Sequence, residues 1–96
     1  MKLVVLGAGE SGVGAAILGK KQGYEVFVSD KGAIIQKYKQ VLLNNKILFE
    51  EGAHNESKIL EADIVMKSPG IQDKILLIQK LIAKGIPVIS EIEFAS

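Results

Sequence analysis

The chain has 96 residues, of which 48% are apolar and 24% are charged, and its formal net charge is +1. This composition is typical of one globular domain, and the nearly balanced charge gives no reason to expect nucleic acid or a membrane as a partner. The absence of cysteine from the sequence excludes disulfides and thiolate metal sites.

Segments typical of strands and helices alternate along the chain. Apolar residues at helical spacing indicate the helices, and glycine or asparagine marks where several of them end. The predicted elements are a strand at Lys2–Leu6, a helix at Gly12–Gln22 ended by Gly23, a strand at Glu25–Asp30, a helix from Ile34 to Asn44-Asn45, a strand at Lys46–Phe49, a short helix at Glu56–Leu60, a strand at Asp63–Met66, a helix at Asp73–Lys84 with Ile75, Ile78, Leu81 and Ile82 on its apolar face, a strand at Ile86–Ile89 and the start of a helix at Glu91–Ser96.

This alternation predicts βαβ units with right-handed crossovers. We therefore expect an α/β fold, namely a Rossmann-like five-stranded parallel sheet with helices on both faces and strand order 3-2-1-4-5. In such a sheet the ligand binds at the carboxyl ends of strands one, two and four, where the strand order reverses.

The segment Gly7-Ala8-Gly9-Glu10-Ser11-Gly12 joins the first strand to the first helix. Glycines let the backbone turn sharply and approach a ligand, and the first amide groups of a helix point at a bound anion. We expect a phosphate or diphosphate site formed by backbone N–H groups and the Ser11 hydroxyl. The alternative is a tight turn with Ser11 as N-cap and no ligand, and the Glu10 carboxylate would repel a phosphate unless it points outward.

Two further segments end at the same edge of the predicted sheet. Asp30 follows the glycine loop by about 20 residues, where such folds place an acid on a ribose or base edge, although a turn aspartate is the alternative. Lys31 could balance phosphate charge or be solvated. In Ser68-Pro69-Gly70-Ile71, Gly70 would let main chain approach the ligand, unless the segment only prepares the next helix. The neighbouring Lys67 could reach an anion.

No catalytic or metal-binding constellation stands out in the sequence. His54 is the single histidine and lies in a polar loop, so we expect an ordinary surface side chain. No Ser-His-Asp set or metal-ligand spacing occurs, and we expect Glu91 and Glu93 to be solvated. We therefore predict no catalytic residue and no metal site.

Four segments occur together in order, and their combination resembles the N-terminal domain of the Mur ligase family, in particular the members that add D-glutamate. The segments are Gly7–Gly12, Val28-Ser29-Asp30, Lys67–Ile71 and Gly85-Ile86-Pro87-Val88-Ile89-Ser90-Glu91-Ile92-Glu93-Phe94. The resemblance covers essentially the whole chain. Its S-P-G-I turn and final I-x-E-I-E-F run are more specific than the glycine loop.

The resemblance implies a cytoplasmic enzyme of peptidoglycan synthesis that joins D-glutamate to UDP-N-acetylmuramoyl-L-alanine through an acyl phosphate, using ATP and magnesium. The first domain of such an enzyme holds the uridine diphosphate. Carried over by position, the resemblance places the diphosphate contacts on Gly9, Glu10, Ser11 and Gly12, and Ser11 stands where the family often has threonine. It places the uracil contact on Asp30 and its neighbour Lys31. Gly70 would line the same pocket. Gly32 stands where close members can have a basic residue, which implies a weaker or differently organised grip on the nucleotide.

The ATP loop of that family, G-T-N-G-K-[ST], does not occur in these residues. We therefore expect one UDP-substrate-binding domain at 1–96, inactive alone and without a cofactor of its own. The ATP-binding and C-terminal ligase domains are expected outside it. An NAD-binding module of a dehydrogenase or regulatory sensor, with Asp30 on the adenosine ribose, is the main alternative. An interaction domain with a vestigial loop is the other.

Overall fold

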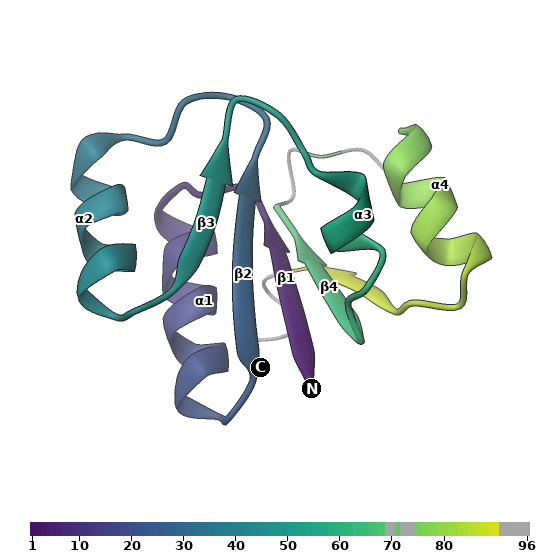
Figure 1. Cartoon of the computed structure of the whole chain (residues 1–96), viewed down its shortest axis with the longest axis horizontal. Helices are drawn as coiled ribbons and strands as arrows, with labels where there is room; N and C mark the ends of the chain where they lie inside the picture. The colour runs from purple at the N-terminus through teal and green to yellow at the C-terminus, as the bar shows by residue number, and fades with distance from the viewer. Residues whose placement is uncertain (69–70, 72–74, 91–96) are drawn as a thin grey trace.

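The computed structural model describes residues 1–68, 71 and 75–90, and within them five parallel strands form one sheet with the order β3-β2-β1-β4-β5 (Figure 1). The predicted fold class and strand order are confirmed. The elements are β1 (Lys2–Leu6), α1 (Glu10–Lys21), β2 (Glu25–Asp30), α2 (Gln36–Asn44), β3 (Leu48–Glu51), α3 (Glu56–Ile59), β4 (Ile64–Lys67), α4 (Leu76–Ala83) and β5 (Val88–Ser90).

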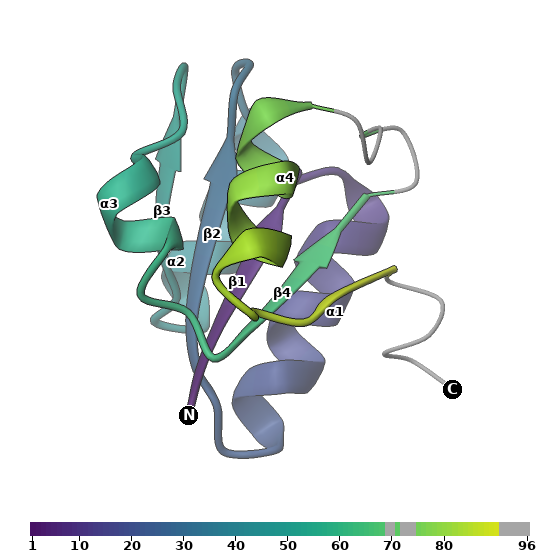
Figure 2. The ribbon, with the colours of Figure 1, turned by 90° about the vertical axis from the view of Figure 1, so that its right-hand side faces the viewer.

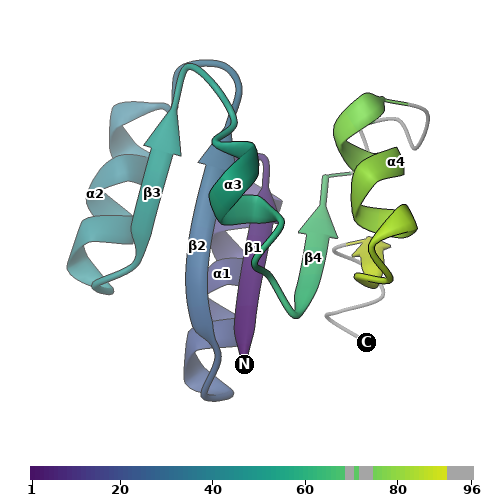
Figure 3. The same cartoon turned by 45° about the vertical axis from the view of Figure 1, so that its right-hand side comes forward.

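The central strand β1 is buried on both faces of the sheet (Figures 2 and 3). Because side chains alternate along a strand, Leu3 and Val5 join the core under α1 and α2, whereas Val4 and Leu6 join the core under α3 and α4. A continuous apolar run with helices on both sides is the expected form of a central parallel strand. In the described part of the chain, no helix combines the length and apolar character needed to cross a membrane.

Three helices end in the same hydrogen-bonded motif, the Schellman motif. A residue just past each helix takes a left-handed conformation, namely Gly23 (φ 93°), Lys46 (φ 57°) and Gly85 (φ 84°). The next residue then donates its N–H back to the last turn, in bonds from Tyr24 N to Gly19 O (3.1 Å), from Ile47 N to Leu42 O (2.9 Å) and from Ile86 N to Leu81 O (3.0 Å). The predicted stops at Gly23 and Gly85 are thus parts of these motifs.

These helix ends explain why two strands begin later than predicted. Lys46 and Ile47 complete the end of α2, so β3 begins at Leu48 and not at Lys46. In the same way Ile86 completes the end of α4, and β5 begins at Val88 and not at Ile86. Ile47 and Ile86 are buried in both cases. Their apolar character marks a helix end that packs on the core and not the first residue of a strand.

Other boundaries move for local reasons. The helix α1 begins at Glu10 with Gly9 as N-cap and no side-chain cap, so the alternative of Ser11 as N-cap is wrong. On α4 the buried residues are Leu77, Ile78 and Leu81, whereas the predicted Ile82 is 54% exposed and Ile75 precedes the helix. The predicted start of that helix at Asp73 and the predicted helix at Glu91–Ser96 lie outside the described residues.

We predict opposite effects for two glycine-to-alanine substitutions. Gly85→Ala places a side chain at φ 84° and should lower the free energy of unfolding, by about 1–2 kcal/mol. Gly14 is exposed within α1, and nothing lies within 4 Å of the carbon that alanine would add. Gly14→Ala should therefore raise the free energy of unfolding by about 0.5–1 kcal/mol. Urea denaturation measures both, and equal effects would contradict the assignment of Gly85 to a helix-ending motif.

Candidate functional site

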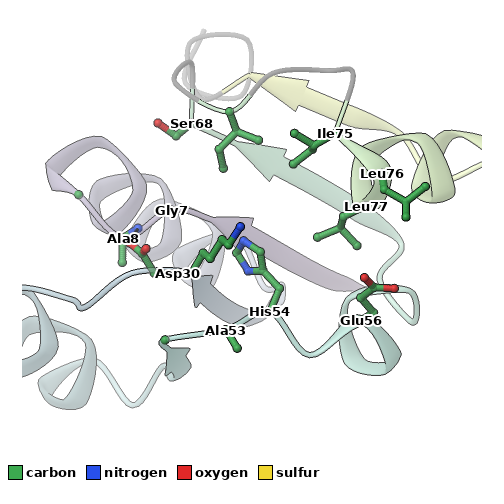
Figure 4. Close-up of a pocket in the computed structure, with 14 residues that line it drawn as sticks. Gly7, Ala8, Asp30, Ala53, His54, Glu56, Ser68, Ile75, Leu76 and Leu77 are labelled. Atoms are coloured by element: carbon green, nitrogen blue, oxygen red, sulfur yellow. Dashed lines mark hydrogen bonds between the residues drawn. The ribbon is translucent and has the colours of Figure 1, made fainter.

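A cavity of about 840 Å³ opens at the carboxyl ends of β1, β2 and β4 (Figure 4). This is the edge of the sheet at which the strand order reverses and at which ligands bind in open α/β folds. The residues around it come from the loops after these strands, from the loop after β3, and from the starts of α3 and α4. They are Gly7, Ala8, Gly9, Asp30, Lys31, Gly52, Ala53, His54, Glu56, Ser68, Ile71, Ile75, Leu76 and Leu77.

The first glycine of the loop after β1 is required by the protein itself. Gly7 has a φ of 100°, and a Cβ there would lie 3.1 Å from the Cβ of Ser68. The N–H of Gly7 donates to the carbonyl of Ser29 at 2.8 Å. Gly7 therefore holds the loop against β2 and β4, and any larger residue would push these segments apart.

Gly9 is different, because the protein's own atoms do not require a glycine there. Its φ is −80°, which suits any residue, and nothing lies within 4 Å of the place a Cβ would occupy. Gly9 lines the cavity as N-cap of α1, and no side chain caps this helix. The first N–H groups of a helix have no acceptor within it, and the positive end of the helix dipole favours an anion beside them. This end of the cavity is therefore suited to a phosphate.

Asp30 ties the glycine loop to the end of β2. Its Oδ2 accepts a hydrogen bond from the N–H of Ala8 and its Oδ1 accepts one from the N–H of Gly32, each at 2.9 Å. The side chain lies at the cavity, beside Ala8 and Gly7 in Figure 4. The amide of Ala8 is thus already bonded to a carboxylate, so the amides left for a ligand begin at Gly9.

The structure brings only some of the predicted site residues together. Gly9, Asp30 and Lys31 line the cavity. Glu10 and Ser11 are exposed in the first turn of α1 and Gly12 is buried in it, and none of the three lines the cavity. Gly70 lies outside the described residues.

Lys67, the lysine of the loop after β4, does not line the cavity. Its Nζ donates to the carbonyl of Ile71 at 3.0 Å, which ties Ile71 to the end of β4. The opposite wall of the cavity is apolar and consists of Ile71, Ile75, Leu76 and Leu77. Figure 4 shows the last three of these facing the polar residues across the cavity. Such a wall could pack against the flat face of a base.

The expectation that His54 is an ordinary surface residue is wrong. His54 is half-buried at the cavity, and its Nδ1 lies 2.6 Å from the hydroxyl of Ser29, which is fully buried. The same hydroxyl lies 2.7 Å from Oε2 of Glu50. Burial lowers the pKa of His54, and the nearby carboxylates of Glu50 and Asp30 only partly oppose this. The signal in the sequence was Ser29 itself, because a serine on an inward-facing position of a strand needs a polar partner.

The described residues contain no group of three or more His, Cys, Asp and Glu side chains arranged to hold a metal ion.

The comparisons with known proteins define the family. The family described as "Mur ligase MurD-like, N-terminal domain" matches residues 1–90. The chain is 63% identical over 95 residues to a UDP-N-acetylmuramoylalanine–D-glutamate ligase of Christiangramia forsetii, and 60% identical over 94 residues to that of Bacteroides thetaiotaomicron. These alignments cover 99% and 98% of this chain, and 21% of each relative. The chain therefore belongs to the MurD-like N-terminal domain family of Mur ligases, as the sequence motifs predicted, and it spans about a fifth of the length of these relatives.

Solved structures share the fold at much lower sequence identity. A murein peptide ligase of Psychrobacter arcticus superposes with a TM-score of 0.87 at 22% identity, over 100% of this chain and 20% of that one. The UDP-N-acetylmuramate-alanine ligase of Thermotoga maritima gives a TM-score of 0.81 at 19% identity, over 99% of this chain and 22% of that one. The fold is thus shared with these two structures although few residues are identical.

We predict that Asp30→Ala destabilises the domain. The substitution leaves the amides of Ala8 and Gly32 without their acceptor, and hydrogen bonds to a charged group contribute about 1.5–3 kcal/mol. Urea denaturation should show a loss in this range. Glu25→Ala, an exposed acid at the other end of β2, is the control and should change the unfolding free energy by less than about 0.5 kcal/mol. Equal effects of the two substitutions would mean that the hydrogen bonds of Asp30 to Ala8 and Gly32 do not stabilise the fold.

A second prediction concerns pH. In the unfolded chain His54 takes up a proton near pH 6.5, whereas burial in the folded chain delays protonation to lower pH. The contribution of the neutral His54 to the free energy of unfolding is therefore fully present above pH 6.5. It is lost as the pH falls from 6.5 toward the lowered pKa, at up to about 1.4 kcal/mol per pH unit. Urea denaturation at about pH 7.5 and at about pH 5.5 measures this contribution. Between these two pH values the free energy of unfolding should fall less in His54→Gln than in the original chain. An equal loss in both proteins would contradict this.

Proposed function

We propose that this chain binds the uridine diphosphate part of UDP-N-acetylmuramoyl-L-alanine, as the first domain of an ATP-dependent ligase that adds D-glutamate in peptidoglycan synthesis. The relatives at 63% and 60% identity are named as D-glutamate ligases and have UDP-N-acetylmuramoylalanine in their names. The observation that carries the proposal is the uncapped start of α1, which opens on a cavity at the edge where the strand order reverses.

In the proposed complex the diphosphate lies at the start of α1. The N–H groups of Gly9, Glu10, Ser11 and Gly12 are the donors, because the first four amides of a helix lack internal acceptors. Lys31 lines the same cavity and adds a positive charge. The Glu10 side chain is exposed at the first helical position, where an acid interacts well with the helix dipole and can stay directed to solvent.

Asp30 has a double role in this proposal. Its two bonds to Ala8 and Gly32 shape the loop that carries the diphosphate donors. Each carboxylate oxygen can accept more than one hydrogen bond, so Asp30 can still accept one from the uracil or the ribose. The apolar wall of Ile71, Ile75, Leu76 and Leu77 would pack against the base.

The chemical step belongs, in this proposal, to the rest of a longer parent enzyme. ATP, Mg²⁺ and D-glutamate would bind to ATP-binding and C-terminal domains there, and the acyl phosphate would form there. The 96 residues then hold one end of the substrate, in the cytoplasm, and catalyse nothing alone. Gly70 stays a predicted pocket residue.

The test is the binding of UDP to this chain and to two glycine variants. Gly9→Ala adds one methyl group in open space at the start of α1, at a stability cost of at most about 1 kcal/mol from the N-cap position. This methyl would occupy the place of the diphosphate, so we expect UDP affinity to fall by about tenfold or more, a loss of about 1.4 kcal/mol. Calorimetry or NMR titration measures the affinity.

Gly14→Ala, the same change within α1 but away from the cavity, is the matched control and should bind UDP as the original chain does. NADH serves as the competing ligand. Binding of NADH without UDP would support the dinucleotide alternative. Unchanged UDP binding in Gly9→Ala would show that the diphosphate is not held at this helix end.

A further inference from the structure

His54, Ser29 and Glu50 form a hydrogen-bonded chain beneath the cavity. Oε2 of Glu50 lies 2.7 Å from the Ser29 hydroxyl and accepts a second bond, also at 2.7 Å, from the N–H of Asn55. Nδ1 of His54 lies 2.6 Å from the same hydroxyl. The serine is fully buried and belongs to β2, whereas Glu50 and His54 come from β3 and the loop after it.

The geometry determines which ring nitrogen of His54 carries the proton. An ionised carboxylate only accepts hydrogen bonds, so the single hydroxyl proton of Ser29 is donated to Glu50. The Ser29 oxygen must then accept from His54, which requires a proton on Nδ1. In a neutral imidazole the other nitrogen, Nε2, is a bare acceptor. Because burial lowers the pKa of His54, the neutral ring is the form present at neutral pH.

No described residue hydrogen-bonds to Nε2 of His54, and the ring lies among the residues that line the cavity (Figure 4). Four charged groups surround the ring. They are the carboxylates of Glu50, Asp30 and Glu56 and the ammonium of Lys31. Glu50 is held by Ser29 and Asn55, Asp30 by Ala8 and Gly32, and Glu56 by Lys80 at 2.7 Å. His54 thus differs from the acids near it, because its outer nitrogen has no such partner.

We propose that His54 is a nucleotide-binding residue whose Nε2 accepts a hydrogen bond from the nucleoside of the bound ligand, either from the imide N–H of the base or from the ribose 2′-hydroxyl. Ser29 and Glu50 are positioning residues that fix the ring and its tautomer. This inference rests on the proposed function, since it names a further contact of the same cavity.

A neutral acceptor suits this place for an electrostatic reason. The ligand has a diphosphate that would lie at the start of α1, and another carboxylate aimed into the cavity would repel it. A neutral imidazole nitrogen accepts a hydrogen bond without adding negative charge. It would also reject a ligand that presents an acceptor at that point, because two acceptors cannot pair.

Two substitutions separate binding from structure. Asparagine places an amide near the position of Nδ1, so His54→Asn can keep the contact with Ser29 but has no atom where Nε2 lies. Glutamine reaches the position of Nε2, so His54→Gln can still offer an acceptor to the ligand. We expect UDP affinity to fall about 3- to 10-fold in His54→Asn, the effect of one neutral hydrogen bond, and to fall less in His54→Gln. The opposite order would mean that His54 acts only through Ser29, which would overturn the proposal.

Modified nucleotides identify the donor. If the ribose 2′-hydroxyl is the donor, 2′-deoxy-UDP binds the original chain more weakly than UDP does, and His54→Asn does not distinguish the two. If the imide N–H is the donor, N3-methyl-UDP binds the original chain more weakly than UDP does, and His54→Asn does not distinguish these two nucleotides. Equal sensitivity of His54→Asn and the original chain to both modifications would overturn the proposal.

The tautomer is tested without any ligand. Long-range ¹H–¹⁵N NMR spectra of the imidazole should show a protonated Nδ1 and an unprotonated Nε2 at neutral pH, and a proton on Nε2 would overturn the inference. The two proposals fail in different ways. No UDP binding to the original chain would reject the proposed function. UDP binding that is equally tight in His54→Asn would reject only the role of His54.

Discussion

The candidate site depends on one carboxylate that joins two chain segments. Asp30, at the end of β2, accepts hydrogen bonds from the amides of Ala8 and Gly32 at 2.9 Å. The parallel pairing of β1 with β2 sets Leu6 opposite Ser29, so the next residue of β2 reaches the loop that follows β1. The hydrogen bond from Ala8 to Asp30 fixes the direction in which the chain enters α1. It thereby also fixes where the first amides of that helix, which have no acceptor within it, lie relative to the cavity.

Much of this arrangement could be predicted from the sequence. Alternating strands and helices with a buried apolar β1 allow few topologies other than a parallel sheet, and its strand order then decides which loops meet at one edge. The boundaries were less predictable, because apolar residues serve two purposes. Ile47 and Ile86 resemble the first residues of strands, yet they are buried as parts of helix ends. Local spacing does not separate these roles, whereas the left-handed residue before each of them does.

The role of His54 could not be predicted from its neighbours in the sequence. Its partner Ser29 lies 25 residues earlier, and only the pairing of β2 with β3, which sets Ser29 opposite Glu50, brings the three side chains together. The identity of the ligand is a different matter. Helix amides, an acid and an apolar wall suit several nucleotides. The proposal of a uridine nucleotide therefore rests on the names of the relatives and not on the geometry of the cavity.

The charges around the cavity explain how a site with several carboxylates could hold a diphosphate. Asp30 is held by two backbone amides, and Glu56 forms an ion pair with Lys80 at 2.7 Å, so the negative charge of both is compensated by groups of the protein. Lys31 forms no ion pair with any residue in the described part of the chain, and its charge is available to a ligand. In the proposed complex a neutral His54 would offer the nucleoside an acceptor, in addition to Asp30, without adding negative charge to the cavity. Protonation of His54 would exchange that acceptor for a donor, so the burial that keeps its pKa low also preserves the hydrogen-bonding pattern of the site.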